Sequence, residues 1–430
     1  MKEQESIAST KVERSAKFIK TGVKVGSNYI KHYTKKLFDP SISKEELNED
    51  NARDIYNSLS ELKGSALKVA QMLSMDKNIL PKAYVNQFAK SQYNAPPLSG
   101  PLIVRTFSKY FGKSPDKIYD RFNMVSSNAA SIGQVHKAEL NGKELAVKIQ
   151  YPGVAESISS DLKLVKPFAF RLLGMSEKEL EVYLKEVEQK MLEETDYELE
   201  LERSQKFASA CAHLSNLVFP NYYPELSSQR IITMDWMDGK HLKEFLAENP
   251  SQEERNRIGQ SLWDFYNYQQ HVLKAVHADP HPGNFLITKD GKLGVLDFGC
   301  IKEIPEDFYE PFFSLTKRET LENKELTLDA FRKLEMILPE DNEQEIAFYY
   351  KWYKEMISIF AEPYMSEYFN FDNPEFMNKL YQFGEQLSKM PEFKQARGVK
   401  HFIYINRTNF GLYSILFELK AKVRTSLPQY

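Results

Sequence analysis

The chain has 430 residues, which is too long for one hydrophobic core, so we expect two or three structural units. Its hydrophobic content of 42%, charged content of 27% and net charge of −3 are typical of a globular protein and give no case for nucleic-acid binding. With only Cys211 and Cys300, no apolar run of the roughly 18 residues that span a membrane and no secretory signal, the sequence predicts a cytoplasmic protein without a disulfide framework.

Apolar residues recur at alternating steps of four and three between residues 10 and 38, which predicts an amphipathic helix. Its other faces are rich in lysine. Such a helix either docks on the body of the protein or lies on an anionic membrane surface. Peripheral membrane contact is therefore an alternative that the sequence leaves open.

A second helix is predicted over residues 52–74. Lys68 and Gln71 lie opposite its apolar stripe, at helical spacing, together with Gly64. The prolines and glycine that follow, up to Gly100, indicate a boundary. We therefore assign residues 1–100 to an N-terminal helical extension.

The next segments alternate between strands and helices. Residues 135–140 and 145–149 flank Asn141-Gly142 and predict a hairpin. Residues 178–206 predict one long charged helix, residues 230–234 a strand, and the chain beyond Pro305 is helical almost to its end. Strands early and helices late predict an α+β, two-lobed protein, with a small lobe over residues 101–236 and a helical large lobe over residues 237–430.

The densest motif is His277-Ala278-Asp279-Pro280-His281-Pro282-Gly283-Asn284, followed by Asp297-Phe298-Gly299. The residues between predict a tight hairpin, which would bring Asn284 and Asp297 together with Asp279 nearby. Magnesium takes few protein oxygens besides phosphate, and a separate aspartate orients the attacking hydroxyl. This pattern predicts a kinase catalytic loop, with Asp279 as the base and Asn284 and Asp297 as metal ligands.

His277 and His281 do not predict a zinc site, because neither a cysteine nor a third histidine accompanies them. We expect both histidines to be structural.

Kinases also place a lysine on a strand to bind the nucleotide phosphates, and hold it with a helical glutamate. Ala146-Val147-Lys148 supplies the lysine. Local spacing does not choose its partner among the acidic residues of the charged helix, which are Glu194, Asp196, Glu198, Glu200 and Glu202.

The segment that should clasp the phosphates, from Asn128 to Gln134, contains only one glycine. Alanine is strained at positive φ, so this loop cannot fold over phosphates as a glycine-rich loop does. Either the protein is not a standard kinase or the loop has a different use.

In their order along the chain, these motifs resemble the UbiB-type atypical kinases, also called the AarF or ADCK group. The resemblance covers roughly residues 60–300 by motif, and the rest of the C-terminal part more weakly. It includes Ala-Ala-Ser-Ile-Gly-Gln-Val-His from residue 129, Ala-Val-Lys, Glu-Thr-Asp-Tyr from residue 194, the loop at 277–284 and Asp-Phe-Gly. It implies a protein-kinase-like fold that binds ATP and Mg²⁺, and a role in support of ubiquinone biosynthesis.

The resemblance also implies roles for single residues. Lys68-Val69-Ala70-Gln71 matches the family's Lys-x-Gly-Gln motif, with Ala70 in place of the glycine, on a helix that lies over the active site. Glu194 and Asp196 would then pair with Lys68, which leaves Glu200 as the partner of Lys148. The implied nucleotide-binding residues are Ala129, Ala130, Ser131, Lys148, Met234 and Met237.

We therefore predict an ATP-dependent phosphotransferase or ATPase that acts on a small molecule or lipid in isoprenoid-quinone metabolism. The helix that carries Lys68 should exclude generic protein substrates. One alternative is a small-molecule kinase of the aminoglycoside or choline type, which the alanine-rich loop and the Lys68–Gln71 helix oppose. Another is a nucleotide-gated, non-catalytic module that presents hydrophobic intermediates, which the intact Asp279, Asn284 and Asp297 oppose.

Overall fold

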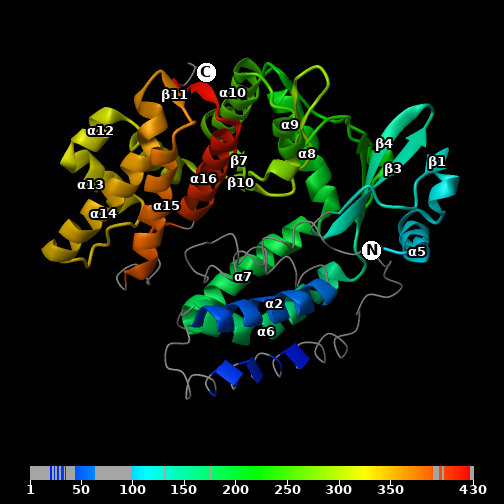
Figure 1. The fold of residues 1–430 in the computed structure, drawn as a ribbon, viewed down its shortest axis with the longest axis horizontal. Coiled ribbons are helices and arrows are strands. Elements are labelled where there is room, and N and C mark those ends of the chain that lie inside the picture. Colours follow the sequence, from blue (N-terminus) through cyan, green and yellow to red (C-terminus); the bar gives the residue numbers. More distant parts are fainter. Residues whose placement is uncertain are drawn as a thin grey trace. The chain divides into compact units, whose positions relative to one another are not determined.

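The computed structural model describes residues 20–21, 24, 27–28, 31–32, 34, 44–62, 98–129, 132–173, 177–390, 397–399 and 401–426. The chain divides into two compact units, and Figure 1 labels helices and strands of both. Unit 1 comprises Met1–Glu202 and Asn221–Trp236, and unit 2 comprises Arg203–Pro220 and Met237–Tyr430. The finer division into extension, small lobe and large lobe stays a prediction.

Unit 1 is built on an antiparallel sheet of strand order β1–β3–β4–β6, with β2 also paired to β3. Its strands are β1 (Arg121–Phe122), β2 (Asn128–Ala129), β3 (Gly133–Leu140), β4 (Lys143–Gln150) and β6 (Ile231–Asp235). Its helices are α2 (Lys44–Leu62), α5 (Gly100–Phe111), η2 (Pro115–Lys117), α6 (Val154–Leu173), α7 (Glu177–Glu194), η3 (Pro224–Leu226) and the first part of α8 (Tyr197–Cys211).

The predicted hairpin is confirmed as β3–β4, and its turn explains why the sequence signal was clear. Asn141 and Gly142 adopt φ values of 52° and 75°. Two consecutive positive φ angles match the right-handed twist of a hairpin, and Asn-Gly accepts them at little cost. From Leu145 onward β4 is buried on both faces, so even Lys148 lies inside unit 1.

A buried polar relay ties the start of the described segment 98–129 to β3. The backbone N–H of Leu98 donates to Gln134 Oε1 (2.8 Å), and Gln134 Nε2 lies 2.7 Å from His136 Nε2. The other ring nitrogen of His136, Nδ1, lies 2.8 Å from the carbonyl oxygen of Asn123. Because a carbonyl only accepts, Nδ1 carries the proton and Nε2 accepts from Gln134. The relay therefore requires a neutral imidazole.

The prediction of a single long helix over residues 178–206 was wrong. The chain forms two separate helices there, α7, which ends at Glu194, and α8, which begins at Tyr197. Between them, the carbonyl oxygen of Thr195 accepts from Gln150 Nε2 (3.0 Å) and Arg230 Nη1 (2.5 Å). Asp196 Oδ1 accepts from the backbone N–H of Leu199 (3.0 Å) and so caps α8. The chain breaks here because this carbonyl bonds to the sheet instead of to the next helical turn.

The two predicted N-terminal helices are described only in part. The helix predicted to begin at residue 52 begins earlier, at Lys44, and its predicted continuation beyond residue 62 lies outside the described residues. The whole apolar stripe of the basic helix predicted over residues 10–38 also lies outside the described residues. Among the described positions, Asn28 Nδ2 donates to Asn51 Oδ1 (3.2 Å) and Asp54 Oδ2 (2.9 Å) of α2.

Unit 2 is mainly helical, as predicted. Its helices are the rest of α8, α9 (Leu242–Ala247), α10 (Gln252–Tyr268), the π-helix η4 (Gln269–Leu273), η5 (Pro282–Asn284), α11 (Glu306–Ser314), α12 (Arg318–Glu322), α13 (Lys324–Lys333), α14 (Glu343–Ala361), η6 (Glu362–Met365), α15 (Pro374–Lys389) and α16 (His401–Leu419).

Small sheets complete unit 2. Its strands are β5 (Leu217–Val218), β7 (Ala275–His277), β8 (Phe285–Ile287), β9 (Leu293–Val295), β10 (Ile301–Glu303), β11 (Tyr368–Asn370) and β12 (Lys422–Arg424). Strand β9 pairs with β5 in parallel and with β8 antiparallel, while β7 pairs with β10. The pairing of β11 with β12 was not predicted.

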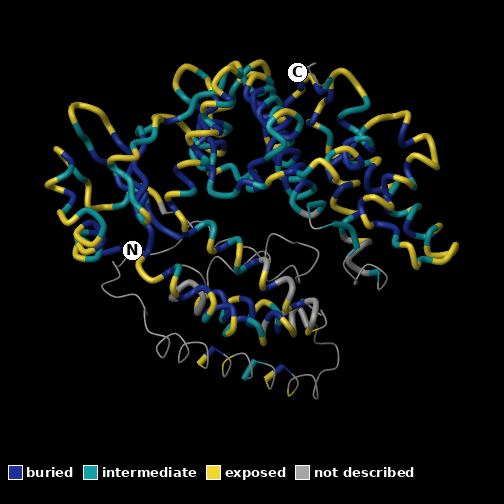
Figure 2. Tube along the Cα trace, turned by 180° about the vertical axis from the view of Figure 1, so that it is seen from behind, coloured by how far each residue is buried: buried dark blue, intermediate teal, exposed yellow. Residues whose placement is uncertain are grey.

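Helix α10 runs through the core of unit 2. Trp263, Phe265 and Tyr266 are almost completely buried, and Trp263 stacks with Tyr413 of α16 at 6.4 Å between ring centroids. In Figure 2 the buried residues, in dark blue, alternate with exposed ones along such helices, as expected for amphipathic elements. Among the described helices, none is long and apolar enough to cross a bilayer.

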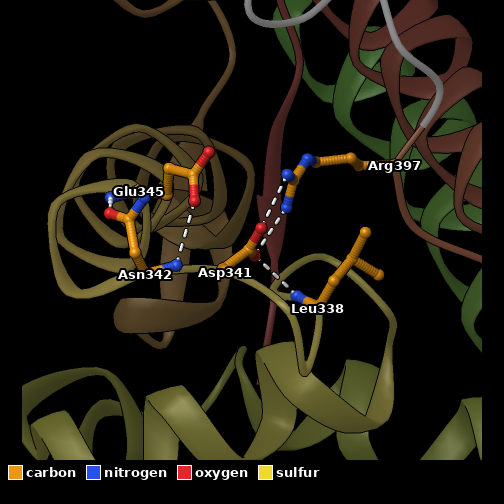
Figure 3. A network of polar contacts seen from close by, with 5 residues as sticks. All are labelled: Leu338, Asp341, Asn342, Glu345 and Arg397. Carbon is orange, nitrogen blue, oxygen red and sulfur yellow. Dashed lines mark hydrogen bonds and ion pairs between the residues drawn. The ribbon is translucent and has the colours of Figure 1, made fainter.

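A buried ion pair fixes the described segment 397–399 just ahead of α16 (Figure 3). Arg397 donates from Nη1 to Asp341 Oδ2 (2.6 Å) and from Nη2 to Asp341 Oδ1 (2.7 Å), and Leu338 N–H donates to the same carboxylate (2.7 Å). Asp341 directly precedes Asn342, which caps α14 together with Glu345. The pair therefore links the start of α14 to the segment that leads into α16.

Candidate active site

Lys148 and Glu200, which lie 52 residues apart in sequence, meet in the interior of unit 1. Lys148 Nζ is 2.5 Å from Glu200 Oε1, and the side chains are only 10% and 7% exposed. Lys148 Nζ also lies 5.1 Å from the ring centroid of Tyr197, one turn earlier on α8. Glu198 and Glu202 point to solvent, so the helix selects Glu200 from the acidic candidates by its periodicity.

The glycine of the alanine-rich segment is needed for close packing. A Cβ atom at Gly133 would collide with the carbonyl oxygen of Ile149 and lie 2.9 Å from Tyr197 Oη. Gly133 thus lets β3 approach the end of β4 and the start of α8. Ala129 lies on β2 opposite Gln134, whereas Ala130 and Ser131 lie outside the described residues.

The two methionines among the implied nucleotide-binding residues fall in different units. In unit 1, Met234 lies on β6 opposite Ala146 of the Ala-Val-Lys motif and is buried. In unit 2, Met237 Cε lies so near Gly294 that a Cβ there would be 2.7 Å from it. Their contact with a nucleotide stays a prediction.

The predicted hairpin after the catalytic loop is confirmed, with β8 and β9 pairing so that Phe285 lies opposite Val295. The pairing continues one step outward, because Leu296 N–H donates to the carbonyl oxygen of Asn284 (3.0 Å). The side-chain amide of Asn284 donates from Nδ2 to the carbonyl oxygen of Asp279 (2.9 Å). Asp297 follows Leu296 directly, so these bonds bring Asp279, Asn284 and Asp297 to the same end of the hairpin.

Buried rings hold the cluster in place. Phe298 is fully buried, with ring centroids 5.8 Å from Phe207 and 6.0 Å from both Phe219 and His277. Next to Phe298, Asp297 Oδ1 accepts from the backbone N–H of Gly299 (2.6 Å). The aromatic packing therefore fixes the backbone from which Asp297 projects.

His277 and His281 both make contacts that suit the structural role expected of them. The backbone N–H of His277 donates to Gln269 Oε1 (2.8 Å), and burial lowers the pKa of its ring, although the nearby carboxylates of Asp279 and Asp297 act to raise it. His281 Nδ1 accepts from the backbone N–H of Gly283 (3.0 Å).

The donor chemistry at the hairpin end fits Mg²⁺. Because Nδ2 of Asn284 is bonded to Asp279, the amide oxygen is the atom that Asn284 offers to a metal, and Asp297 adds a carboxylate. Hard oxygen donors of this kind, few in number, are what Mg²⁺ uses when phosphates and water complete its shell. Within the described ranges, no group of three or more His, Cys, Asp and Glu side chains is arranged to hold a metal.

Sequence reasoning missed Arg407. Its Nη2 atom lies 3.4 Å from Asp279 Oδ1, across 128 residues of chain. The local signal was a charged residue, with Asn406 and Asn409 beside it, inside the mainly apolar residues 402–417.

The predicted contacts of the Lys68 helix stay predictions. Lys68 and Gln71 lie outside the described residues. Glu194 ends α7, and the Asp196 side chain caps α8.

Comparison with known proteins gives a consistent result. Residues 90–328 match the model of a protein family described as the ABC1 atypical kinase-like domain. The chain is 28% identical to the probable serine/threonine-protein kinase abkA of Dictyostelium discoideum, over 98% of this chain and 79% of that protein. It is 32% identical to the mitochondrial atypical kinase COQ8 of Saccharomyces cerevisiae, over 65% of this chain and 56% of that protein.

A solved structure, the Rv3197–erythromycin complex from Mycobacterium tuberculosis, is similar to this chain with a TM-score of 0.59 and 26% identity. The likeness covers 88% of this chain and 95% of the solved one. Together with the family match, it confirms the predicted α+β, kinase-like fold. The chain spans only about half the length of several curated relatives, among them the COQ8 proteins of Saccharomyces cerevisiae and Schizosaccharomyces pombe.

Proposed function

The chain belongs to the ABC1 atypical kinase-like family, the UbiB or ADCK group, and from this premise we propose that it binds Mg-nucleotide and transfers or hydrolyses the terminal phosphoryl group. The observation that carries the proposal is the gathering of Asp279, Asn284 and Asp297 at one end of the β8–β9 hairpin. Phosphoryl transfer requires a residue that orients the nucleophile and oxygen ligands that hold Mg²⁺ at the phosphates, and these three side chains supply both.

Lys148 of unit 1 suits the nucleotide phosphates. Its ammonium group is buried and held by Glu200, so it is preorganised, and little conformational freedom remains to be lost when an anion binds. Met234, which lies opposite Ala146 on the neighbouring strand, is a proposed contact of the nucleotide.

Asn284 and Asp297 of unit 2 are the proposed metal ligands. Bound there, Mg²⁺ would neutralise charge that develops on the phosphate oxygens. Asp279 orients the attacking hydroxyl or water and accepts its proton. The side-chain amide of Asn284 holds the backbone of Asp279 by donating a hydrogen bond to the Asp279 carbonyl oxygen. Asn284 thus uses its amide nitrogen to hold Asp279 and its amide oxygen to bind the metal.

The proposed substrate is a small molecule or lipid of isoprenoid-quinone metabolism. Support comes from the motifs shared with the UbiB group and from relatives named as atypical COQ8 kinases. We also propose that generic protein substrates are excluded, by the helix expected to carry Lys68 and Gln71, and that the basic N-terminal helix contacts anionic membrane surfaces.

The test is a Mg-dependent thermal shift with ATP and with ADP. A ligand at 100 times its dissociation constant stabilises the native state by about 2.7 kcal/mol, which a melting curve detects. Asp297→Asn should lose the Mg-dependent part, because a neutral amide replaces a carboxylate poorly at Mg²⁺. Asp290→Asn, in the exposed turn of the same hairpin, is the matched control and should keep the shift. An unchanged Mg-dependent shift in Asp297→Asn would contradict the metal assignment.

A further inference from the structure

One face of α16 lies against the catalytic loop and the neighbouring strand β10, although this helix begins 73 residues after the segment that matches the family model. Tyr404, Arg407 and Gly411 share this face, since residues three, four and seven apart on a helix are neighbours. Lys302 of β10 places its Nζ atom 4.8 Å from the ring centroid of Tyr404. Figure 1 shows α16 (red) beside β7 and β10.

Gly411 permits the closest approach. A Cβ atom at this position would collide with Cγ of Pro280 and lie 3.3 Å from its carbonyl oxygen. Pro280 directly follows Asp279, so α16 packs against the backbone of the candidate catalytic loop. Any larger residue at position 411 would push the loop and the helix apart.

Arg407, one turn before Gly411, reaches the side chain of Asp279. Its Nη2 atom is 3.4 Å from Oδ1, and both side chains are about a quarter exposed, at 26% and 28%. Asp279 is therefore held at two points: Asn284 bonds its backbone carbonyl, and Arg407 pairs with one carboxylate oxygen.

We propose that α16 completes the active site and that Arg407 is a positioning residue, which orients the carboxylate of Asp279 toward the attacking hydroxyl or water. An ion pair that solvent still reaches, at a separation of 3.4 Å, contributes little to folding, so the main effect of this pair falls on the orientation of Asp279. A misplaced reacting group loses rate steeply, by about 100-fold for an error near 1 Å. The inference rests on the proposed phosphoryl chemistry.

The experiment measures turnover of Mg-ATP and nucleotide dissociation constants for the full chain and for Arg407→Gln, Arg407→Lys and Gly411→Ala. Arg407→Gln should lower turnover by about 10- to 100-fold with an unchanged dissociation constant, because the guanidinium acts on Asp279 and not on the nucleotide. Arg407→Lys, which keeps the cation, should recover part of the loss. Gly411→Ala should also lower turnover, by displacing the loop.

Two controls separate positioning from general damage. Arg424→Gln removes an arginine of unit 2 that pairs with Glu367 at 3.6 Å on the surface, and it should match the parent. In an Asp279→Asn background, Arg407→Gln should cause no further loss, since residues that act through one another are not additive.

The outcomes distinguish the inference from the function on which it rests. Parent-like turnover in Arg407→Gln, or additive losses in the double variant, would overturn the positioning role while leaving the proposed function standing. A parent that binds Mg-ATP but has no turnover would overturn both. If Arg407→Gln does not fold, equal turnover of Arg407→Lys and Gly411→Ala to the parent overturns the inference.

Discussion

Replacing Arg397 by alanine should destabilise unit 2 more than any ordinary surface change. Its guanidinium makes two hydrogen bonds of 2.6 and 2.7 Å to Asp341 (Figure 3). It also lies over the ring of Tyr349, 3.7 Å from the ring centroid. The two charged side chains are only 9% and 2% exposed. Arg397→Ala removes both guanidinium hydrogen bonds and leaves the Asp341 carboxylate buried, with the Leu338 N–H still donating to it. Stranding one partner of a buried pair costs about 3–5 kcal/mol.

Urea unfolding followed by circular dichroism measures this loss, and a melting curve should shift by roughly 6–20 °C at about 2–4 °C per kcal/mol. Replacing both partners, as in Arg397→Met with Asp341→Leu, should recover most of the stability, because no charge is then stranded. Arg424→Ala, whose ion pair is exposed, should stay within about 0.5 kcal/mol of the parent. Arg397→Ala that unfolds with the parent's midpoint would refute the reasoning.

The pair also has a pH signature. The hydrogen bonds from Arg397 are the main cause that lowers the pKa of Asp341. A carboxyl group whose pKa is lowered by folding stabilises the folded state at pH values above its unfolded-state pKa of about 3.9. This stabilisation disappears as the pH falls through the folded-state pKa. The stability gap between parent and Arg397→Ala should therefore narrow in that acidic window.

Three further predictions concern unit 1. Lys148→Met alone should destabilise unit 1 by about 3–5 kcal/mol, because it removes the cation paired with the buried Glu200 carboxylate. Adding Glu200→Leu should restore stability but not nucleotide binding, and nucleotide binding by the double variant would contradict the phosphate role. Gly133→Ala should cost about 1–3 kcal/mol because its Cβ meets the Ile149 carbonyl, whereas Gly100→Ala, which meets nothing within 4 Å, should be neutral. Burial lowers the pKa of His136, so the neutral ring stabilises the fold above the unfolded-state pKa of about 6.5, and this stabilisation decreases as the pH falls below that value. His136→Gln should lose this acid sensitivity in melting curves. An identical pH dependence in the parent and the variant would contradict the prediction.

Sequence patterns predicted the parts of the fold that are locally determined. Asn141-Gly142 specifies the first hairpin, because both residues tolerate the positive φ angles that its turn needs. In the turn of the second hairpin, Gly291 alone of the Asp290-Gly291 pair adopts a positive φ, of 76°. The second hairpin in turn brings Asn284 next to Leu296 and Asp297, which is why a linear motif was sufficient to predict a cluster.

Features that depend on distant contacts were not predictable in the same way. The break between α7 and α8 contains neither glycine nor proline, and it is set by bonds from Gln150 and Arg230 to the carbonyl of Thr195. Pairing of β11 with β12 joins three-residue strands that are far apart in sequence. Arg407 contacts Asp279 although the two residues are 128 positions apart, so no local spacing in the sequence could predict the contact.

The most direct test of the central claim compares Mg-ATP turnover by the full chain with that of Asp279→Asn, alongside nucleotide binding by both. The account predicts phosphate release or phosphoryl transfer by the parent, nearly unchanged nucleotide affinity in the variant, and turnover reduced by about 100-fold or more, because Asp279 acts on the nucleophile and not on the phosphates. Equal turnover in the two proteins would contradict it.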